Sequence, residues 1–207
     1  MTTESQPLQP QTLIDRVLVG ARLRAHRKQL KLTLKQVSEQ SGVALSTLSK
    51  MELGQATVSY DKLAAAARAL NIGLPQLFSS DESSGSSEPV TVVSSKISEA
   101  AGYATGHYEY HPLAGDFPGR NMMPIYARIQ ARALKEFEDF IRHPGQEFVM
   151  VLSGCICIHF ETGEEICLRE RETAYFNSAV GHVYLVEGDK DAEIIAVTSE
   201  PWDQVSS

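Results

Sequence analysis

The sequence lacks the features of a membrane or secreted protein. No stretch approaches the roughly 18 consecutive apolar residues that a membrane-spanning helix requires, and the first residues, MTTESQPLQPQ, have neither the basic start nor the apolar core of a secretion signal. Cysteine is scarce too: the 207 residues include only Cys155, Cys157 and Cys167. An odd, clustered set fits a reducing cytoplasm better than a disulfide framework. We therefore expect a cytoplasmic protein without a membrane segment.

Acidic residues are scarce in the first part of the chain, and basic residues are scarce in the second. Residues 1–78 hold ten Lys and Arg against five Asp and Glu, whereas residues 79–207 hold nine against twenty-one, for a net formal charge of −7. The first part is basic and the second acidic, so only the first part is suited to contact a polyanion. Chance variation of surface charge would produce the same asymmetry, so charge alone does not decide the function.

A change in hydrophobic period divides the chain. The segment SSDESSGSSEP is rich in Ser and Gly and has no large apolar residue, which is typical of a flexible linker. Before it, apolar residues recur every three or four positions, as in helices; beyond it they alternate, as in strands. The predicted fold class is therefore α plus all-β, in two domains. The predicted ranges are a disordered tail at 1–11, a helical domain at 12–78, the linker at 79–89 and a β-domain at 90–207.

Two short helices joined by a tight turn are predicted in the helical domain. Thr33 and Gln36 have the spacing of a capping box, which opens a helix that ends at Gly42. A second helix, ALSTLSKMEL, ends at Gly54. Two helices in this order have the pattern of a helix-turn-helix, whose second helix enters the major groove of DNA.

Residues 19–78 resemble the helix-turn-helix domain of the XRE (phage-repressor-like) transcriptional regulators. The likeness includes LRxxR in the first helix, the SGV turn, the recognition helix STLSKMELG and the closing ALNIGLPQLF. It implies a five-helix lambda-repressor-like bundle that binds a double-stranded DNA operator as a homodimer. It also implies an ion pair between Arg27 and Glu52. Ala44 departs from the family, in which a polar N-cap residue usually opens the recognition helix.

The resemblance also implies which residues contact DNA. Hydroxyl groups and a lysine at the start of the recognition helix suit base edges, and Leu45 suits a thymine methyl group, although an apolar contact within the domain explains Leu45 equally well. Basic residues outside this helix are expected to contact phosphates, which position the protein without specifying sequence. The full predicted set is Arg24, Lys28, Thr33, Lys35, Gln36, Leu45, Ser46, Thr47, Ser49 and Lys50.

The β-domain resembles a cupin, which implies a jelly-roll barrel (a double-stranded β-helix). The first cupin motif has two histidines with one residue between them, then a glutamate and, after six more residues, a glycine. Here Ile141 takes the place of the first histidine, whereas His143, Glu147 and Gly154 match the others. The second motif lacks its usual PxGD but keeps His182.

Three of these residues form a candidate metal site. His143, Glu147 and His182 are a 2-His-1-carboxylate set, which binds non-haem iron and leaves open coordination positions. The expected metal is one divalent transition ion, namely Fe, Ni or Zn. The alternative is a metal-free pocket in which the same three residues, with Tyr126 and Arg128, bind a small-molecule effector.

Two other patterns leave their roles open. Cys155, Cys157 and His159 alternate along one strand, where a soft-metal or redox site and ordinary burial are both possible readings. Tyr126 and Arg128 belong to one row of a predicted strand, and the sequence does not say whether that row lines a pocket or faces solvent.

The two resemblances together indicate a sequence-specific transcriptional regulator, not an enzyme. Its cupin domain would sense a small metabolite and alter operator binding. The alternative is a cupin metalloenzyme of the iron-dependent oxygenase or epoxidase type, since some such epoxidases also carry a helix-turn-helix domain before a cupin. The acidic β-domain and the intact STLSK helix favour the regulator.

Overall fold

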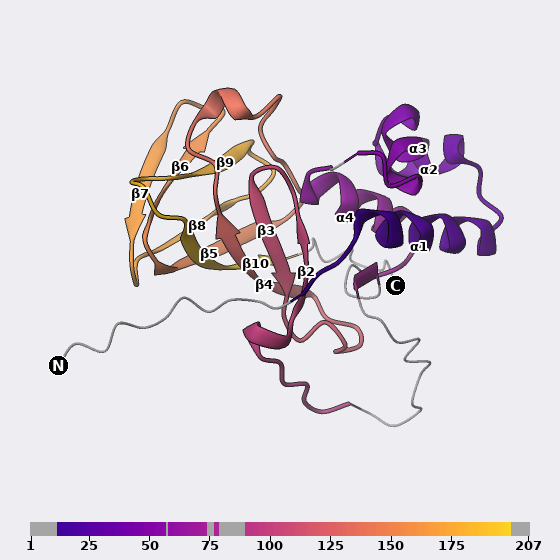
Figure 1. The fold of residues 1–207 in the computed structure, drawn as a ribbon, viewed down its shortest axis with the longest axis horizontal. Helices are drawn as coiled ribbons and strands as arrows, with labels where there is room; N and C mark the ends of the chain where they lie inside the picture. The colour runs from indigo at the N-terminus through magenta and orange to yellow at the C-terminus, as the bar shows by residue number, and fades with distance from the viewer. Residues whose placement is uncertain (1–11, 57, 74–76, 79–89, 200–207) are drawn as a thin grey trace, which may run out of the picture.

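The computed structural model describes residues 12–56, 58–73, 77–78 and 90–199 and has an α-helical and a β-sheet part, shown side by side in Figure 1. The predicted tail at 1–11 and linker at 79–89 lie outside the described residues. No helix among the described residues is long and apolar enough to cross a membrane. The helical part consists of α1 (Arg16–Gln29), α2 (Leu34–Ser41), α3 (Leu45–Glu52) and α4 (Tyr60–Ala69).

The turn between α2 and α3 follows the local sequence. Thr33 caps α2, and the Gln36 side chain bonds back to the Thr33 backbone, which completes the predicted capping box. Gly42 ends α2 with a φ of 71°, a left-handed conformation that favours glycine. Ala44 precedes α3 and supplies no side-chain cap. The turn therefore directs α3 away from α2, as a helix-turn-helix requires.

The described residues before residue 79 show four complete α-helices, not the five of the predicted bundle. Leu77 and Phe78 are helical as well, but the residues before them, 74–76, lie outside the described residues. After α4 the backbone turns left-handed at Asn71, with a φ of 52°, and Gly73 follows. Asn and Gly both end helices readily, because they tolerate that conformation at low cost. Beyond them, Leu77 and Phe78 are buried in the hydrophobic core.

The β-part is built from two sheets. One has the order β1-β2-β3-β4-β10-β5-β8, and the other has the order β7-β6-β9. The strands are β1 (Thr12–Leu13), β2 (Ala101–Ala104), β3 (Tyr108–Pro112), β4 (Met122–Ile129), β5 (Gln146–Ser153), β6 (Cys155–Phe160), β7 (Glu165–Arg169), β8 (Thr173–Asn177), β9 (His182–Val186) and β10 (Ala192–Ser199). Two single-turn helices, Ile97–Glu99 and Leu134–Glu136, complete the elements. The sandwich-like arrangement agrees with a cupin.

The core of the β-part follows the period-two pattern. Val149 and Val151 on β5 and Ile194 on β10 are almost completely buried, while their neighbours along the strands are more exposed. Alternate residues of a strand point to opposite faces, so these strands of the larger sheet contribute an apolar row to the interior. β10 pairs with both β4 and β5 and lies near the middle of the larger sheet.

The helical and β-parts share contacts and a strand. β1 precedes α1 in the chain but pairs in parallel with β2. The Tyr103 hydroxyl on β2 accepts from the Val58 amide at 3.1 Å and donates to the Val58 carbonyl at 3.2 Å, and the Phe78 ring stacks on the Tyr103 ring. In Figure 1, α4 is the helix that faces the β-part beside β3. These contacts fix the start of α4 against the larger sheet.

Candidate functional site

The recognition helix α3 packs on α1 and α2 through one face. Leu48 and Met51 are buried there, whereas Ser46 and Lys50 are exposed and Leu45 is 47 % exposed. The exposed face can therefore reach a DNA groove, and the Leu45 side chain is not confined to the interior. Leu45 and Ser46, two of the predicted base contacts, lie on this exposed face.

The other predicted DNA contacts divide into exposed and half-buried side chains. Arg24, Lys28 and Lys35 are exposed, and Lys35 lies 3.8 Å from Glu39 as a surface ion pair. Thr47 and Ser49 are half-buried. Thr33 and Gln36 use their side chains in the capping box, which they would keep while facing a phosphate.

The predicted Arg27–Glu52 contact is present. The guanidinium donates through Nε to Glu52 Oε1 at 2.5 Å and through Nη2 to Oε2 at 2.8 Å, so the pair is bidentate. A third donor, Nη1, bonds the Leu32 carbonyl at 2.9 Å. Hydrogen bonding to Glu52 raises the pKa of Arg27. The pair therefore links α1 to the end of the recognition helix and to the chain before α2.

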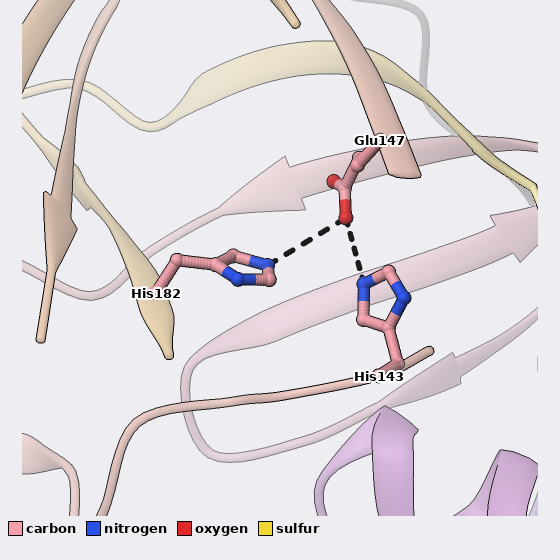
Figure 2. A group of neighbouring side chains, drawn as sticks. All are labelled: His143, Glu147 and His182. Carbon is pink, nitrogen blue, oxygen red and sulfur yellow. Dashed lines mark hydrogen bonds and ion pairs between the residues drawn. The ribbon is translucent and has the colours of Figure 1, made fainter. Parts of the chain in front are cut away.

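The residues of the candidate metal site meet inside the β-part (Figure 2). His143 lies just before β5, Glu147 is the second residue of β5 and His182 opens β9. His143 Nε2 is 2.8 Å and His182 Nε2 3.6 Å from the same oxygen, Glu147 Oε2. The three ligand atoms lie within 4.8 Å of one another. His143 and Glu147, four residues apart, and the distant His182 therefore present nitrogen and oxygen donors to one point.

Backbone geometry brings His143 and Glu147 to the same side of the chain. Gly145 lies between them with a φ of 98°, and a Cβ there would lie 1.9 Å from the Ser199 carbonyl oxygen. Only glycine accommodates both that conformation and that close approach. The amide of His143 also donates to the Ser178 carbonyl at 3.0 Å. The tight turn therefore aims both side chains into the interior.

Hydrogen bonds outside the triad orient its ligand atoms. His182 Nδ1 donates to the Val180 carbonyl at 2.9 Å, since a carbonyl only accepts, and this orients the ring so that Nε2 faces Glu147. The Tyr184 hydroxyl donates to Glu147 Oε1 at 2.5 Å, which leaves Oε2 facing the histidines. Metal-binding histidines and carboxylates commonly have such outer partners.

The carboxyl of Glu147 is held in its ionised form. Burial would raise its pKa, but hydrogen bonds and charge interactions with His143 and His182 outweigh burial and lower the pKa to about 2. A buried carboxylate and two imidazoles that share one point suit Fe, Ni or Zn, which accept mixed nitrogen and oxygen ligands. The residues present therefore fit a divalent transition metal.

The triad faces a small cavity of about 40 Å³. Its walls are mainly aliphatic and phenolic, and they include Tyr108, Tyr110 and Tyr184 of the β-part. One further wall residue, Tyr60, comes from α4 of the helical part. The Tyr60 ring lies 4.8 Å from the Tyr110 ring, and its hydroxyl contacts Met123 Sδ. Both parts of the protein therefore enclose the same cavity.

Tyr126 and Arg128, predicted for an effector pocket, do not line this cavity. Ile125, Ala127 and Ile129 on β4 line it instead, because alternate residues point to opposite faces. Arg128 lies 3.6 Å from Glu109 on the other face. The four tyrosines of the cavity were missed because nothing in their local sequence signals that strands and a helix from distant positions converge.

The cysteines depart from the expectation that they would not form a disulfide. Cys157 and Cys167 are bonded to each other, whereas Cys155 is free. The physical reason is register: β6 and β7 pair antiparallel with Cys157 directly opposite Cys167. Glu165 lies close to both sulfurs. This group lies outside the cavity described above.

Comparison with known proteins identifies both domains. Residues 23–77 match the helix-turn-helix family model HTH_3, and residues 134–198 match a cupin domain model. An HTH_3 family transcriptional regulator from Vibrio cholerae is similar at 18% identity, over 90% of this chain and 97% of that chain, with a TM-score of 0.59. Hydroxypropylphosphonic acid epoxidase from S. wedmorenis is similar at 19% identity, over 89% and 98%, with a TM-score of 0.46. No match was found among curated proteins.

The fold and the matched models define a two-domain protein. The chain joins an N-terminal segment that matches a helix-turn-helix model of the XRE type to a C-terminal segment that matches a cupin domain model. At 18% identity, the likeness to the Vibrio cholerae regulator shows a shared fold alone.

Proposed function

We propose that the protein is a sequence-specific DNA-binding transcriptional regulator whose cupin cavity binds a small metabolite and thereby alters operator binding. The observation that carries this proposal is the shared cavity: Tyr60 of the helix-turn-helix domain lines the space that His143, Glu147 and His182 face. A ligand in that space contacts both domains, so its binding energy depends on how they are placed. That dependence is what couples two sites in one protein.

The DNA-binding part of the proposal rests on the exposed face of α3 and on the basic residues beside it. We expect a homodimer on a double-stranded operator in the cytoplasm, because one recognition helix reads too few base pairs for useful specificity. The precise contacts are the ten residues predicted from the sequence, of which Ser46 and Lys50 are the most exposed on α3.

The test is selection of DNA sequences from a random pool by the full chain, followed by fluorescence anisotropy on the enriched sequence. We expect a consensus site and an affinity at least about 10³-fold above that for random DNA. A metabolite library is then screened for compounds that raise the melting temperature and change that affinity. The proposal is contradicted if the protein enriches no DNA sequence. It is also contradicted if no compound that stabilises the protein changes its affinity for DNA.

The second candidate function is a cupin metalloenzyme of the iron-dependent oxygenase or epoxidase type. The convergence of His143 Nε2, His182 Nε2 and Glu147 Oε2 favours it, because three such ligands leave coordination positions open. A bound ion would supply Lewis acidity or redox chemistry at those positions. In this case the protein's own residues hold the ion, and the apolar walls exclude water.

Elemental analysis and oxygen uptake separate the two candidates. Protein purified without chelator or affinity tag is assayed for Fe, Ni and Zn, and then for oxygen consumption with small organic substrates. About one equivalent of iron with substrate-dependent oxygen uptake would establish the enzyme. A response to effector that survives dialysis against EDTA, without oxygen uptake, supports the regulator.

A further inference from the structure

The hairpin of β6 and β7 carries four potential metal ligands on one face. Cys157 lies directly opposite Cys167, and His159 lies directly opposite Glu165. The two ligands on each strand are two residues apart, so all four side chains point to the same side of the sheet. Ile158, between the two ligands on β6, points the other way, into the hydrophobic core. The four ligands therefore lie on the face of the smaller sheet that is turned away from the core.

The donor atoms of these residues lie close together. The ligand atoms of Cys157, Glu165 and Cys167 are all within 4.8 Å of one another. His159 Nδ1 is 3.1 Å from Glu165 Oε2, and the other oxygen, Glu165 Oε1, is 3.6 Å from Cys167 Sγ. One carboxylate thus contacts the imidazole through one oxygen and a sulfur through the other. The set offers one nitrogen, one oxygen and two sulfurs.

This combination of donors suits zinc. Zinc in proteins is bound by cysteine thiolates, histidine nitrogens and carboxylate oxygens, usually four together in a tetrahedron. Thiolates are soft ligands that select zinc over magnesium or calcium. Four protein ligands fill the coordination sphere, which is typical of a structural zinc site, whereas the triad in the cavity leaves positions open. A disulfide alone requires neither His159 nor Glu165 beside it, but a four-ligand zinc site requires both.

The hairpin is accessible to an ion from solvent. β7 is an edge strand of the smaller sheet, and Glu165 and Cys167 on it are exposed. In Figure 1, β7 lies on the side of the β-part that is away from the helical part. An ion can therefore reach the four ligands without unfolding of the sheet, and it would be separate from any ion held by the triad.

The charged groups next to the four ligands are compatible with a cation. Cys155 and Arg169 form the next cross-strand pair of the hairpin. Cys155 Sγ lies 3.6 Å from a Glu187 carboxylate oxygen, and Glu172 also acts electrostatically on this thiol. Two carboxylates therefore accompany the one guanidinium. Because the Cys155 sulfur lies against Glu187, we assign it no role as a ligand.

We propose that the β6–β7 hairpin binds one zinc ion when its disulfide is reduced, through Cys157, His159, Glu165 and Cys167. In the disulfide form the two sulfurs are bonded to each other, so no thiolate is available and the hairpin holds no ion. A dithiol reductant opens the bond: it transfers two electrons and two protons to the two sulfurs and itself becomes a disulfide. Zinc then displaces both thiol protons, which pass to water.

This site does not depend on the proposed regulatory function. It also leaves the triad unaffected, because the two sets of ligands lie on different strands or on different faces of the sheets. Metal content of the triad is therefore measured on the disulfide form, in which the hairpin holds no ion.

The test compares the disulfide and dithiol forms of the full-length protein, with Co²⁺ as a spectroscopic probe for the zinc site. The protein is reduced with dithiothreitol, which is then removed by gel filtration without oxygen. Thiolate ligands give Co²⁺ an intense charge-transfer absorption in the near ultraviolet, which the triad cannot produce because it has no sulfur. We expect this absorption in the dithiol form and not in the disulfide form, and we expect titration with Zn²⁺ to abolish it.

Variants of the reduced protein identify the ligands. Cys167→Ser should lose the absorption. His159→Ala and Glu165→Gln should each weaken Co²⁺ binding at least about tenfold, because loss of a direct ligand costs no less than loss of an outer partner. Cys155→Ser is the matched control from the same strand and should keep the wild-type absorption and affinity. Circular dichroism establishes that each variant is folded.

Three results would overturn the proposal. The first is the absence of the absorption in reduced, folded wild-type protein, which would make the bond a covalent cross-link and nothing more. The second is wild-type affinity in both His159→Ala and Glu165→Gln, which would mean that the sulfurs bind the ion without them. The third is an equal loss in Cys155→Ser and Cys167→Ser, which would contradict the assigned set of ligands.

Discussion

At the scale of single residues, the exposed face of α3 separates base readout from phosphate contact. Replacing Ser46 or Lys50 with Ala should lower affinity for the selected operator by about 1–3 kcal/mol and affect random DNA less. Replacing Arg24 or Lys28 should weaken both kinds of DNA alike and reduce the slope of log affinity against log salt by about one. Anisotropy titrations at several salt concentrations measure both effects. Equal losses on operator and random DNA for Ser46→Ala and Lys50→Ala would remove base readout from these residues.

The Arg27–Glu52 pair makes a second prediction at this scale. Both side chains are mostly buried, with 14% and 9% exposed, so Glu52→Gln leaves the guanidinium without its anionic partner. We expect unfolding free energy to fall by about 3 kcal/mol in the full chain, from urea titration. The matched control is Lys35→Gln, which breaks the exposed pair with Glu39 and should cost less than about 0.5 kcal/mol. Similar small losses in both variants would show that the buried pair adds no more than a surface pair.

At the scale of elements, the triad joins the segment before β5, β5 itself and β9 into one candidate metal site. We expect protein purified without chelator to hold up to one equivalent of Fe, Ni or Zn, and His182→Ala and Glu147→Gln to lose it. His159→Ala is the control, because His159 pairs with Glu165 at 3.1 Å outside the cavity. Metal content is measured by elemental analysis. Less than about a tenth of an equivalent in the wild-type protein would contradict metal binding.

The β6–β7 hairpin carries another element-scale prediction. The Cys157–Cys167 bond closes a loop with a sequence separation of 10, and cross-linking a loop of this length restricts the unfolded chain by about 2–3 kcal/mol. Reduction should therefore lower the melting temperature measured by circular dichroism. Cys167→Ser should show the lower value with or without reductant, whereas Cys155→Ser should respond as wild type does. A wild-type melting temperature that is the same in both conditions would mean that the bond adds no stability.

At the scale of the whole molecule, we expect a homodimer on two related half-sites. Their centres should lie one helical turn, roughly 34 Å, apart, because paired recognition helices read successive major grooves on one side of DNA. Light scattering gives the mass of the free protein and of the complex, and footprinting gives the spacing. One chain bound to a single unrepeated site would contradict this arrangement.

The helices and strands could be predicted from the local sequence. Contacts between residues far apart in the chain could not. The capping box at Thr33 and Gln36 and the period-two strands were readable because neighbours a few residues apart determine them. The triad and the Arg27–Glu52 pair required family resemblance, because His182 is far along the chain from His143 and Glu147, and Arg27 is far from Glu52. Tyr60 carries no such signal, since its role depends on how the two domains meet. The disulfide depended on strand register, which spacing alone does not determine.

The parallel pairing of β1 with β2 has a mechanical consequence. The chain leaves the larger sheet at Leu13, forms α1 to α4 and is back in the sheet at Ala101. The helix-turn-helix domain is therefore inserted between two neighbouring strands at the edge of one sheet. Because the chain enters and leaves the domain at that edge, and Val58 is bonded to Tyr103 beside it, unfolding of the edge strands would release the domain from the β-part.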